Sequence, residues 1–161
     1  MICRTGSDLA LVSDIGRIIK LPVQEDCLPL MGRLAQGPMT MRLFPGERIA
    51  GAISLMATST ILVATAQGRI TRIDASQLRR CQRGDLGEIA VNLENDNDRI
   101  QALCSGDDLV GLITSRKRHG RLDARDFACG KPGEASFEQL DLSSDETLLE
   151  LIPLIQDKSR S

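Results

Sequence analysis

The sequence predicts an all-β chain built as an array of about three four-stranded blades. A pattern of short apolar segments recurs at intervals of 49 to 52 residues along the 161-residue chain. These segments are rich in Ile, Val, Leu and Thr and are bounded by Gly, Asp and Asn, which is typical of strands. Helical periodicity is weak throughout, and a repeat period near fifty residues indicates a solenoid or propeller-like architecture.

The first part of each repeat predicts a hairpin. Residues 9–21 align with residues 61–73 at an offset of 52, and these align with residues 110–122 at an offset of 49. Ile15-Gly16 and Gln67-Gly68 fall at the centre of the first two copies, where we expect two-residue loops in which glycine takes a positive φ. Lys117 occupies the place of this glycine in the third copy.

Two further segments follow in the same order in every copy. The third segments are residues 37–43, 87–93 and 133–140, and the fourth are residues 49–55, 100–103 and 148–155. The sequence therefore predicts blades at approximately 8–55, 60–104 and 108–155 within a single domain spanning 1–155, with a polar tail at 156–161. The strands are apolar almost throughout, which favours sheets covered on both faces.

Composition limits the classes of protein to consider. The chain has three Phe and no Tyr or Trp, so its core must be assembled from Leu, Ile, Val, Ala and Met. The cysteines are widely spaced without a C-x-x-C pair, which indicates small buried hydrophobes in a reducing cytoplasm rather than a zinc or redox site. No secretion signal and no apolar run long enough to span a membrane is present, so we expect a soluble cytoplasmic chain with no membrane partner.

Charge is distributed unevenly along the chain. The formal net charge is −2, but residues 1–127 carry 17 basic against 15 acidic side chains and residues 128–161 carry 3 against 7. Of the 20 basic residues 16 are Arg, whose planar guanidinium suits bidentate contact with phosphate. Arg richness can equally reflect genomic base composition.

The sequence shows no catalytic, cofactor or metal site. His119 is the only histidine, and it aligns with Ile18 and Ile70 rather than with a partner suited to acid–base or metal chemistry. The acidic stretch Glu94–Asp98 lacks the glycine and terminal glutamate spacing of a calcium loop, so we interpret it as a polar turn. No nucleophile and base pair, phosphate-binding loop or cofactor fingerprint occurs.

The second repeat resembles one blade of the C-terminal region of the A subunit of DNA gyrase and topoisomerase IV. The resemblance rests on residues 61–72, on Arg83-Gly84-Asp85-Leu86-Gly87 and on residues 89–93. The first repeat resembles the family less closely through residues 32–37, and the third only in outline through residues 130–133. Together the three copies cover nearly the whole chain.

The resemblance implies a β-pinwheel whose basic outer rim binds and bends duplex DNA in the bacterial cytoplasm, at the nucleoid. In that family the domain presents DNA to a topoisomerase catalytic core, in the same or a partner chain, that uses a tyrosine nucleophile and ATP. This sequence contains no tyrosine, so it cannot cleave DNA by itself. We therefore expect a non-catalytic accessory module of an ATP-dependent type II topoisomerase.

Two departures from the family pattern bear on function. Gyrase carries a Gln-Arg-Arg-Gly-Gly-Lys-Gly box associated with chiral wrapping, and the nearest segment here, Gln82–Gly87, lacks the second Arg and the Lys and adds an acid. Gyrase pinwheels also usually have more blades than the three visible here. The sequence leaves open whether the chain is of the gyrase or the topoisomerase IV type.

The predicted DNA-binding residues flank the hairpin turns and the Arg-Gly loop. They are Arg69, Arg72, Arg79, Arg80, Arg83, Arg17, Lys20, Arg116, Lys117, Arg118 and Arg121. A path of cations on repeated loops would contact phosphates without reading bases. Two alternatives stay open: these side chains are solvated strand ends, and the chain is a propeller-like protein-interaction module that has lost DNA wrapping.

Overall fold

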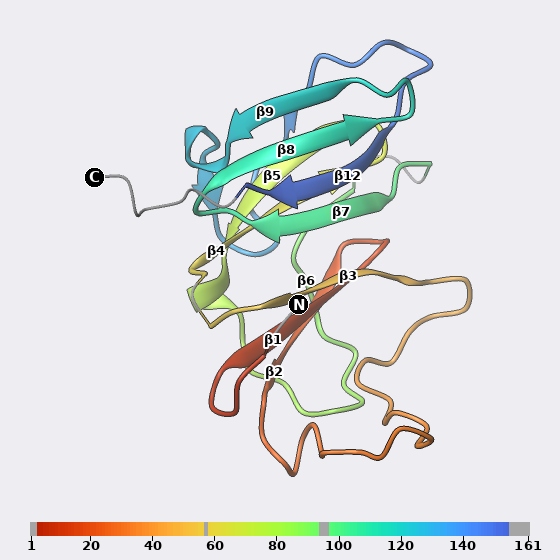
Figure 1. The fold of residues 1–161 in the computed structure, drawn as a ribbon, viewed down its shortest axis with the longest axis vertical. Coiled ribbons are helices and arrows are strands. Elements are labelled where there is room, and N and C mark those ends of the chain that lie inside the picture. The colour runs from red at the N-terminus through yellow and green to blue at the C-terminus, as the bar shows by residue number, and fades with distance from the viewer. Residues whose placement is uncertain (1–2, 57, 94–96, 155–161) are drawn as a thin grey trace.

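The computed structural model describes residues 3–56, 58–93 and 97–154 and is almost entirely β (Figure 1). The short 3-10 helices η1 (Ala75–Gln77) and η2 (Ala124–Asp126) follow the second strands of the last two repeats. The strands are β1 (Asp8–Ser13), β2 (Arg17–Pro22), β3 (Ile49–Ser54), β4 (Thr60–Thr65), β5 (Arg69–Asp74), β6 (Glu88–Ile89), β7 (Ile100–Ser105), β8 (Leu109–Thr114), β9 (His119–Asp123), β10 (Cys129–Gly130), β11 (Glu138–Gln139) and β12 (Leu148–Pro153).

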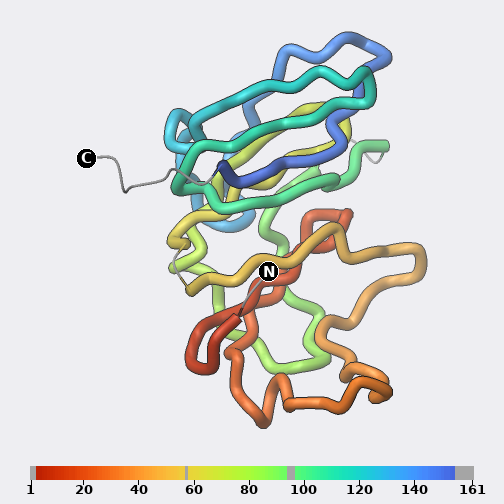
Figure 2. Tube along the Cα trace, in the orientation of Figure 1, coloured from red at the N-terminus to blue at the C-terminus, as the bar shows by residue number. Residues whose placement is uncertain are grey.

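The described strands form three sheets stacked one after another, as the Cα trace in Figure 2 shows. The strand orders are β3-β1-β2-β6, β10-β5-β4-β7 with β11 also on β5, and β12-β8-β9. The all-β, pinwheel-like class and the strands predicted at the first, second and fourth segments are confirmed. The first repeat lies at one end of the array and the third at the other.

The prediction that each repeat supplies all four strands of its own blade is wrong for the third segment. β6 of the second repeat pairs antiparallel with β2 of the first, and β11 of the third repeat pairs antiparallel with β5 of the second. β10 also joins β5, in parallel. We call residues 79–91 and 129–140 the crossing segments, because each one crosses onto the sheet of the preceding repeat.

The turn glycines allow the first crossing segment to approach closely. Gly16 has a φ of +87°, and a Cβ at this position would lie 2.2 Å from the Val91 carbonyl oxygen. The main-chain N–H groups of Ala90 and Val91 both donate to the Gly16 oxygen, at 2.9 and 3.1 Å. A side chain at Gly16 would therefore displace the segment that links the first two sheets.

The hairpin turns confirm the predicted positive φ and correct the predicted loop length. Gly68 has a φ of +80°, and Lys117, aligned with it, has a φ of +60°. The first two loops, residues 14–16 between β1 and β2 and residues 66–68 between β4 and β5, hold three residues rather than two. A turn closed by the Gly16 N–H donating to the Ser13 oxygen, followed by one residue at positive φ, is the three-residue hairpin loop.

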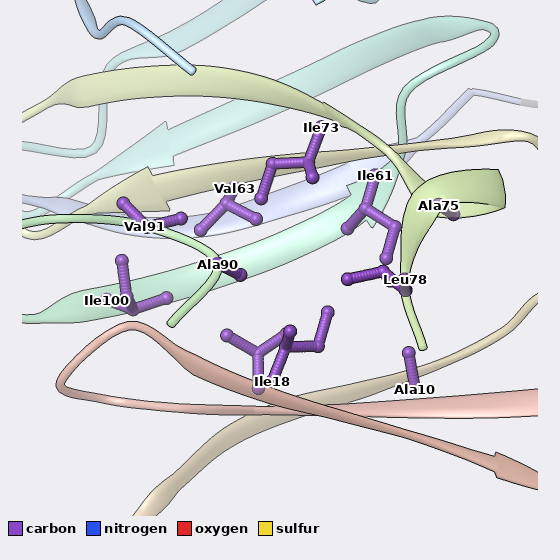
Figure 3. Packing of buried hydrophobic residues seen from close by; sticks show 11 residues of the cluster. Ala10, Ile18, Ile61, Val63, Ile73, Ala75, Leu78, Ala90, Val91 and Ile100 are labelled. Atoms are coloured by element: carbon purple, nitrogen blue, oxygen red, sulfur yellow. The ribbon is translucent and has the colours of Figure 1, made fainter. Parts of the chain in front are cut away.

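Buried aliphatic side chains fill both spaces between the sheets. Figure 3 shows the first cluster, in which Ala10 and Ile18 of the first sheet face Ile61, Val63 and Ile73 of the second. A second cluster lies between the second and third sheets and includes Leu62, Ala64, Ile70, Val110, Ala124, Leu148 and Leu151. All residues of β4 are buried, so the predicted burial of strands on both faces is confirmed for the central sheet.

We predict that Gly16→Ala lowers the free energy of unfolding far more than Gly46→Ala. Gly46 has a φ of +82° but open space around its Cβ position, so alanine there costs only the backbone term of about 1 to 2 kcal/mol. Gly16→Ala adds a clash with main chain, for a total of about 3 kcal/mol or more. Urea unfolding of both variants measures the difference, and equal losses would contradict the close approach.

Candidate nucleic-acid interface

The predicted basic side chains occupy three kinds of environment: buried, paired with acids at the surface, and open. Arg17 is the buried case, with 6% of its surface exposed. Its guanidinium makes a two-point ion pair with the Glu47 carboxylate, Nε lying 2.9 Å from Oε1 and Nη2 contacting Oε2. It also donates to the Arg42 and Leu86 carbonyl oxygens and lies 4.2 Å from the centre of the Phe44 ring.

All three guanidinium nitrogens of Arg17 thus donate to protein groups. The Leu86 oxygen belongs to the second repeat, two residues before β6. Arg17 therefore fastens the first crossing segment, and its placement does not present a cation to a phosphate.

The third repeat contains the same kind of arrangement. The Arg118 Nη1 lies 2.7 Å from Glu146 Oε2, and Thr114 Oγ1 donates to the other oxygen of that carboxylate. The Arg118 N–H donates to Thr114 Oγ1 at 3.3 Å, as the Arg17 N–H donates to Ser13 Oγ at 3.2 Å. Half of the Arg118 side chain stays exposed, so this guanidinium is both paired and reachable from solvent.

In the second repeat, Arg69 takes the same place after the turn. Its N–H donates to Thr65 Oγ1 at 3.2 Å, and its guanidinium lies 4.2 Å from the centre of the Phe137 ring of the next repeat. Asp98 aligns with Glu47 and Glu146, is fully buried, and accepts from the N–H groups of Gln67 and Arg99. Residues 94–96 of the acidic stretch interpreted as a polar turn lie outside the described residues.

The carboxylates of this recurring arrangement were not identified from the sequence, although a signal exists. Glu47, Asp98 and Glu146 each stand two residues before the last long strand of their repeat. Each repeat also has a hydroxyl residue before the hairpin turn and an Arg after it. Aligning the polar positions of the repeats, as well as the apolar ones, would have shown that these three positions recur together.

Hydrogen bonds lower the pKa values of two of these carboxyls. Burial alone would raise the pKa of Glu47, but donors on Arg17, Ser13 and the Phe44 main chain outweigh it and lower the pKa. The pKa of Glu146 is lowered chiefly by the Thr114 hydroxyl, against its burial, with help from the Ser143 N–H and Arg118. Both groups therefore favour the folded state most when they are ionised.

Surface acids hold several other predicted cations. Asp8 lies 3.0 Å from Arg80 Nε and 3.9 Å from Lys20 Nζ, and Lys20 also donates to the Ala75 oxygen at 3.0 Å. Arg116 is paired with Asp145. These contacts partly neutralise the cations in the free protein.

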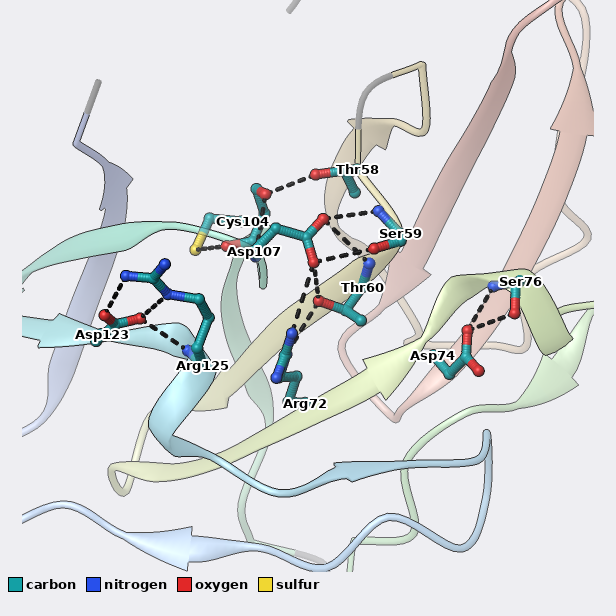
Figure 4. Close-up of polar contacts among 11 residues, drawn as sticks. Thr58, Ser59, Thr60, Arg72, Asp74, Ser76, Cys104, Asp107, Asp123 and Arg125 are labelled. Atoms are coloured by element: carbon teal, nitrogen blue, oxygen red, sulfur yellow. Dashed lines mark hydrogen bonds and ion pairs between the residues drawn. The ribbon is translucent and has the colours of Figure 1, made fainter. Parts of the chain in front are cut away.

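Arg72 belongs to a larger polar cluster around Asp107, drawn in Figure 4. Asp107 accepts from the Ser59 N–H at 2.7 Å and from Thr60 Oγ1 at 2.6 Å, while Arg72 Nη2 lies 3.6 Å away. Burial would raise the pKa of Asp107, but these hydrogen bonds lower it. The cluster ties the start of β4 to the turn before β8 (Leu109–Thr114), so Arg72 serves the fold as well as the surface.

Arg79, Arg83, Lys117 and Arg121 form the open set. All are exposed, and none makes a side-chain ion pair with another described residue. The loop that carries Arg79 and Arg83 is held by the Cys81 N–H donating to the Lys20 oxygen at 2.8 Å. Further exposed cations, which were not predicted from the sequence, are Arg4, Arg33, Arg42, Arg48 and Lys131.

Two kinds of feature are absent from the described ranges. No helix there is long and apolar enough to cross a membrane. No group of three or more His, Cys, Asp or Glu side chains is placed to hold a metal ion in the part of the chain that the structure describes.

The family follows from comparison with known proteins. Residues 7–55 and 59–103 match the model of a family described as the DNA gyrase C-terminal domain, a beta-propeller. The chain belongs to this family. The two matched segments correspond to the first two repeats of this chain. The third repeat, which differs from them at Lys117 and His119, lies outside the match.

Relatives and solved structures agree with this family. The chain is 26% identical to the DNA gyrase A protein of Mycolicibacterium smegmatis over 159 residues, covering 93% of this chain and 18% of the relative. The DNA gyrase A protein of Mycobacterium tuberculosis H37Rv is 28% identical over 108 residues, covering 67% of this chain and 13% of the relative. The chain therefore spans less than a fifth of the length of these curated relatives.

The fold is similar to solved C-terminal domains. The C-terminal domain of DNA topoisomerase IV superposes with a TM-score of 0.79 at 20% identity, covering 92% of this chain and 46% of the other. The E. coli ParC C-terminal domain gives a TM-score of 0.63 at 15% identity, covering 93% and 64%. These structures confirm the pinwheel-like fold predicted from the repeats.

We predict that Glu47→Gln lowers stability at pH 7 and flattens its dependence on acid. Removing one partner of a buried ion pair costs about 3 to 5 kcal/mol. The folded pKa of Glu47 lies below its ordinary value of 4.5. The contribution of this carboxylate to the wild-type free energy of unfolding should therefore be fully present above about pH 4.5 and be lost as the pH falls through the folded pKa. Urea unfolding between pH 7 and pH 3 measures both effects.

The control for this prediction is Arg80→Ala, which removes an exposed side chain from its pair with Asp8. Its cost should stay near the 0 to about 1 kcal/mol of a surface pair. A Glu47→Gln variant that is no less stable than Arg80→Ala would contradict the anchoring role of the buried pair.

Proposed function

We propose that the chain is a non-catalytic DNA-binding module of a type II DNA topoisomerase A subunit, which contacts the phosphates of duplex DNA through basic side chains on its outer surface. Its membership of the DNA gyrase C-terminal domain family carries the proposal. The open set, Arg79, Arg83, Lys117 and Arg121, supplies the primary contacts. Arg80, Arg116 and Arg118 join it where phosphate replaces their acidic partners.

Cations spaced along two repeats suit a continuous phosphate backbone. Such contacts position DNA without reading its sequence, and each one releases condensed counterions, so affinity falls steeply with salt. Bending a site of 20 to 30 base pairs costs on the order of 1 to 6 kcal/mol, which added phosphate contacts offset. The expected activity is sequence-independent binding with some bending.

Chemistry on DNA would belong to a catalytic core in the same or a partner chain. The chain has no tyrosine to act as the strand-cleaving nucleophile, and we assign the use of ATP to the assembled enzyme. On this proposal the module works in the bacterial cytoplasm, at the nucleoid, and delivers a DNA segment to that core.

A specific observation favours the second candidate, a protein-interaction module that has lost DNA wrapping. The net charge is −2, and Lys20, Arg72 and Arg116 each face an acid in the free protein. An outer surface whose cations are neutralised in this way would bind DNA only weakly. Binding at different salt concentrations distinguishes the two functions.

We predict salt-sensitive binding of duplex DNA that depends on the open set. A gel-shift titration at about 50 mM salt should show binding, with a log–log slope that is negative by about 0.9 for each phosphate contact. The double variant Arg79→Ala/Arg83→Ala should lower the affinity and make the slope shallower by about 2.

The matched control is Arg33→Ala/Arg48→Ala, which removes the same charge from exposed positions of the first repeat. This control should change the slope less than Arg79→Ala/Arg83→Ala does, because neither of its side chains belongs to the open set that supplies the primary contacts. Absence of duplex binding by the wild-type chain at about 50 mM salt would overturn the DNA-binding function and favour the interaction module.

A further inference from the structure

An apolar surface lies exposed at the first seam, the place where the crossing segment of the second repeat meets the first sheet. It consists of Phe44 of the first repeat and of Leu86 and Ile89 of the second, whose exposed fractions are 49%, 42% and 57%. We call these three side chains the seam patch. Large apolar side chains that gather at one place on a surface indicate contact with another molecule.

The exposure of the seam patch does not come from a missing neighbour. Leu86 and Ile89 belong to the middle repeat, which has a described repeat on each side. Phe44 corresponds to Ser143 of the third repeat, because the N–H of each donates to the aligned carboxylate, at 2.7 and 3.2 Å. Ser143 is exposed although the second repeat precedes it. These positions therefore stay on the outside of the array when neighbouring repeats are present.

Arg17 holds the seam patch in place. Its guanidinium lies 4.2 Å from the centre of the Phe44 ring and donates to the Leu86 oxygen. Ile89 pairs with Arg17 across β2 and β6. The Glu47 carboxylate accepts from both the Arg17 guanidinium and the Phe44 N–H. Because the patch is positioned before a ligand arrives, little further ordering is needed on binding.

A cavity of about 450 Å³ opens beside the patch. Phe44 and Ile89 line it together with Arg17 and Arg99. The lining that the described residues supply contains no Asp or Glu side chain. The cavity therefore suits a ligand with apolar surface and negative charge rather than a cation.

Two exposed cations border the seam patch. Arg42 stands two residues before Phe44, and Arg83 stands three residues before Leu86. The two stretches lie side by side, because the Arg42 N–H donates to the Asp85 oxygen at 3.0 Å. The patch is thus an apolar surface between positive charges, which is complementary to a polyanion that carries apolar groups between its charges.

We propose that the seam patch is a wedge that inserts between base pairs of the bound duplex and kinks the DNA there, with Phe44 as the leading side chain. The proposal rests on the DNA-binding function proposed above. Proteins that bend DNA insert Phe, Leu or Ile side chains between base steps and partly unstack them. Phosphate contacts alone require only cations, whereas apolar side chains fixed between cations gain contact where the bases are opened.

A wedge differs from a phosphate contact in two measurable ways. It carries no charge, so removing it should lower the affinity without changing the dependence on salt. It must also unstack a base step, and unstacking costs least where the bases are already mismatched. The chain should therefore prefer a duplex with a mismatch to the same duplex without one.

The test compares two duplexes of about 25 base pairs, one fully paired and one with a single central mismatch, by fluorescence anisotropy at about 50 mM salt. The wild-type chain should bind the mismatched duplex about tenfold more tightly. In Phe44→Ala this preference should fall to about twofold or less, whereas Phe44→Leu, which keeps an apolar wedge, should retain most of it. A 2-aminopurine base beside the mismatch should brighten with the wild-type chain and not with Phe44→Ala.

A second variant and a matched control accompany the test. Ile89→Thr keeps a residue suited to a strand and removes apolar surface from the patch, so it should reduce the preference without relying on the Phe44 ring. Leu149→Ala is the control, because Leu149 is 47% exposed and lies on β12 of the third repeat. It should leave the preference unchanged, and urea unfolding shows that each variant is folded.

Four outcomes would overturn the proposal. Equal binding of the two duplexes by the wild-type chain would remove the wedge and leave the DNA-binding function standing, whereas no binding of either duplex would overturn both. A salt slope that becomes shallower by about 1 in Phe44→Ala would mean that a phosphate contact was lost instead. Self-association of the wild-type chain that Ile89→Thr abolishes in sedimentation experiments would make a second copy the occupant of the patch.

Discussion

The close contact between a hairpin turn and the crossing segment of the next repeat is the constraint on which this structure depends. At the first seam, that contact requires a residue without a Cβ at Gly16, since the Val91 carbonyl occupies the space. At the second, Gly68 makes room for the Leu142 side chain, whose Cδ1 lies 2.4 Å from the place that a Cβ would take. The sheets are joined by these contacts and by the aliphatic clusters between them, and isolated repeats would lose both.

The polar groups around the turns follow from the same constraint. A crossing segment brings main-chain carbonyls close to the turn, and Arg17 satisfies two of them while pairing with Glu47. The Arg after the turn therefore marks a structurally important position, but its residue type alone does not show what the side chain does there. Its basic side chain predicted a place on the DNA path, whereas burial and a carboxylate partner make it part of the framework.

The hairpins, the last strand of each repeat and the positive φ at Gly16 and Gly68 could be predicted, because they depend on local residue type and spacing. The pairing of β6 and β11 with the sheet of the preceding repeat could not be predicted, because a strand of two residues is too short to show a periodicity and its sequence does not indicate which strand it pairs with. The open and paired states of Arg79, Arg80 and Arg83 could not be separated either. They depend on whether an acid distant in sequence, such as Asp8 for Arg80, lies within reach.

The third repeat shows how one change at the turn alters what an edge can do. With Lys117 in place of glycine and His119 in place of isoleucine, the β9 edge loses the close approach and the apolar contact that the other two edges use. The positive φ is kept at Lys117 without a glycine, so the hairpin turn by itself does not require one. The close approach of main chain at Gly16 does require one, because a Cβ there would meet the Val91 carbonyl oxygen. Glycine at the turn of the first repeat is therefore demanded by the packing of the next repeat and not by the hairpin itself.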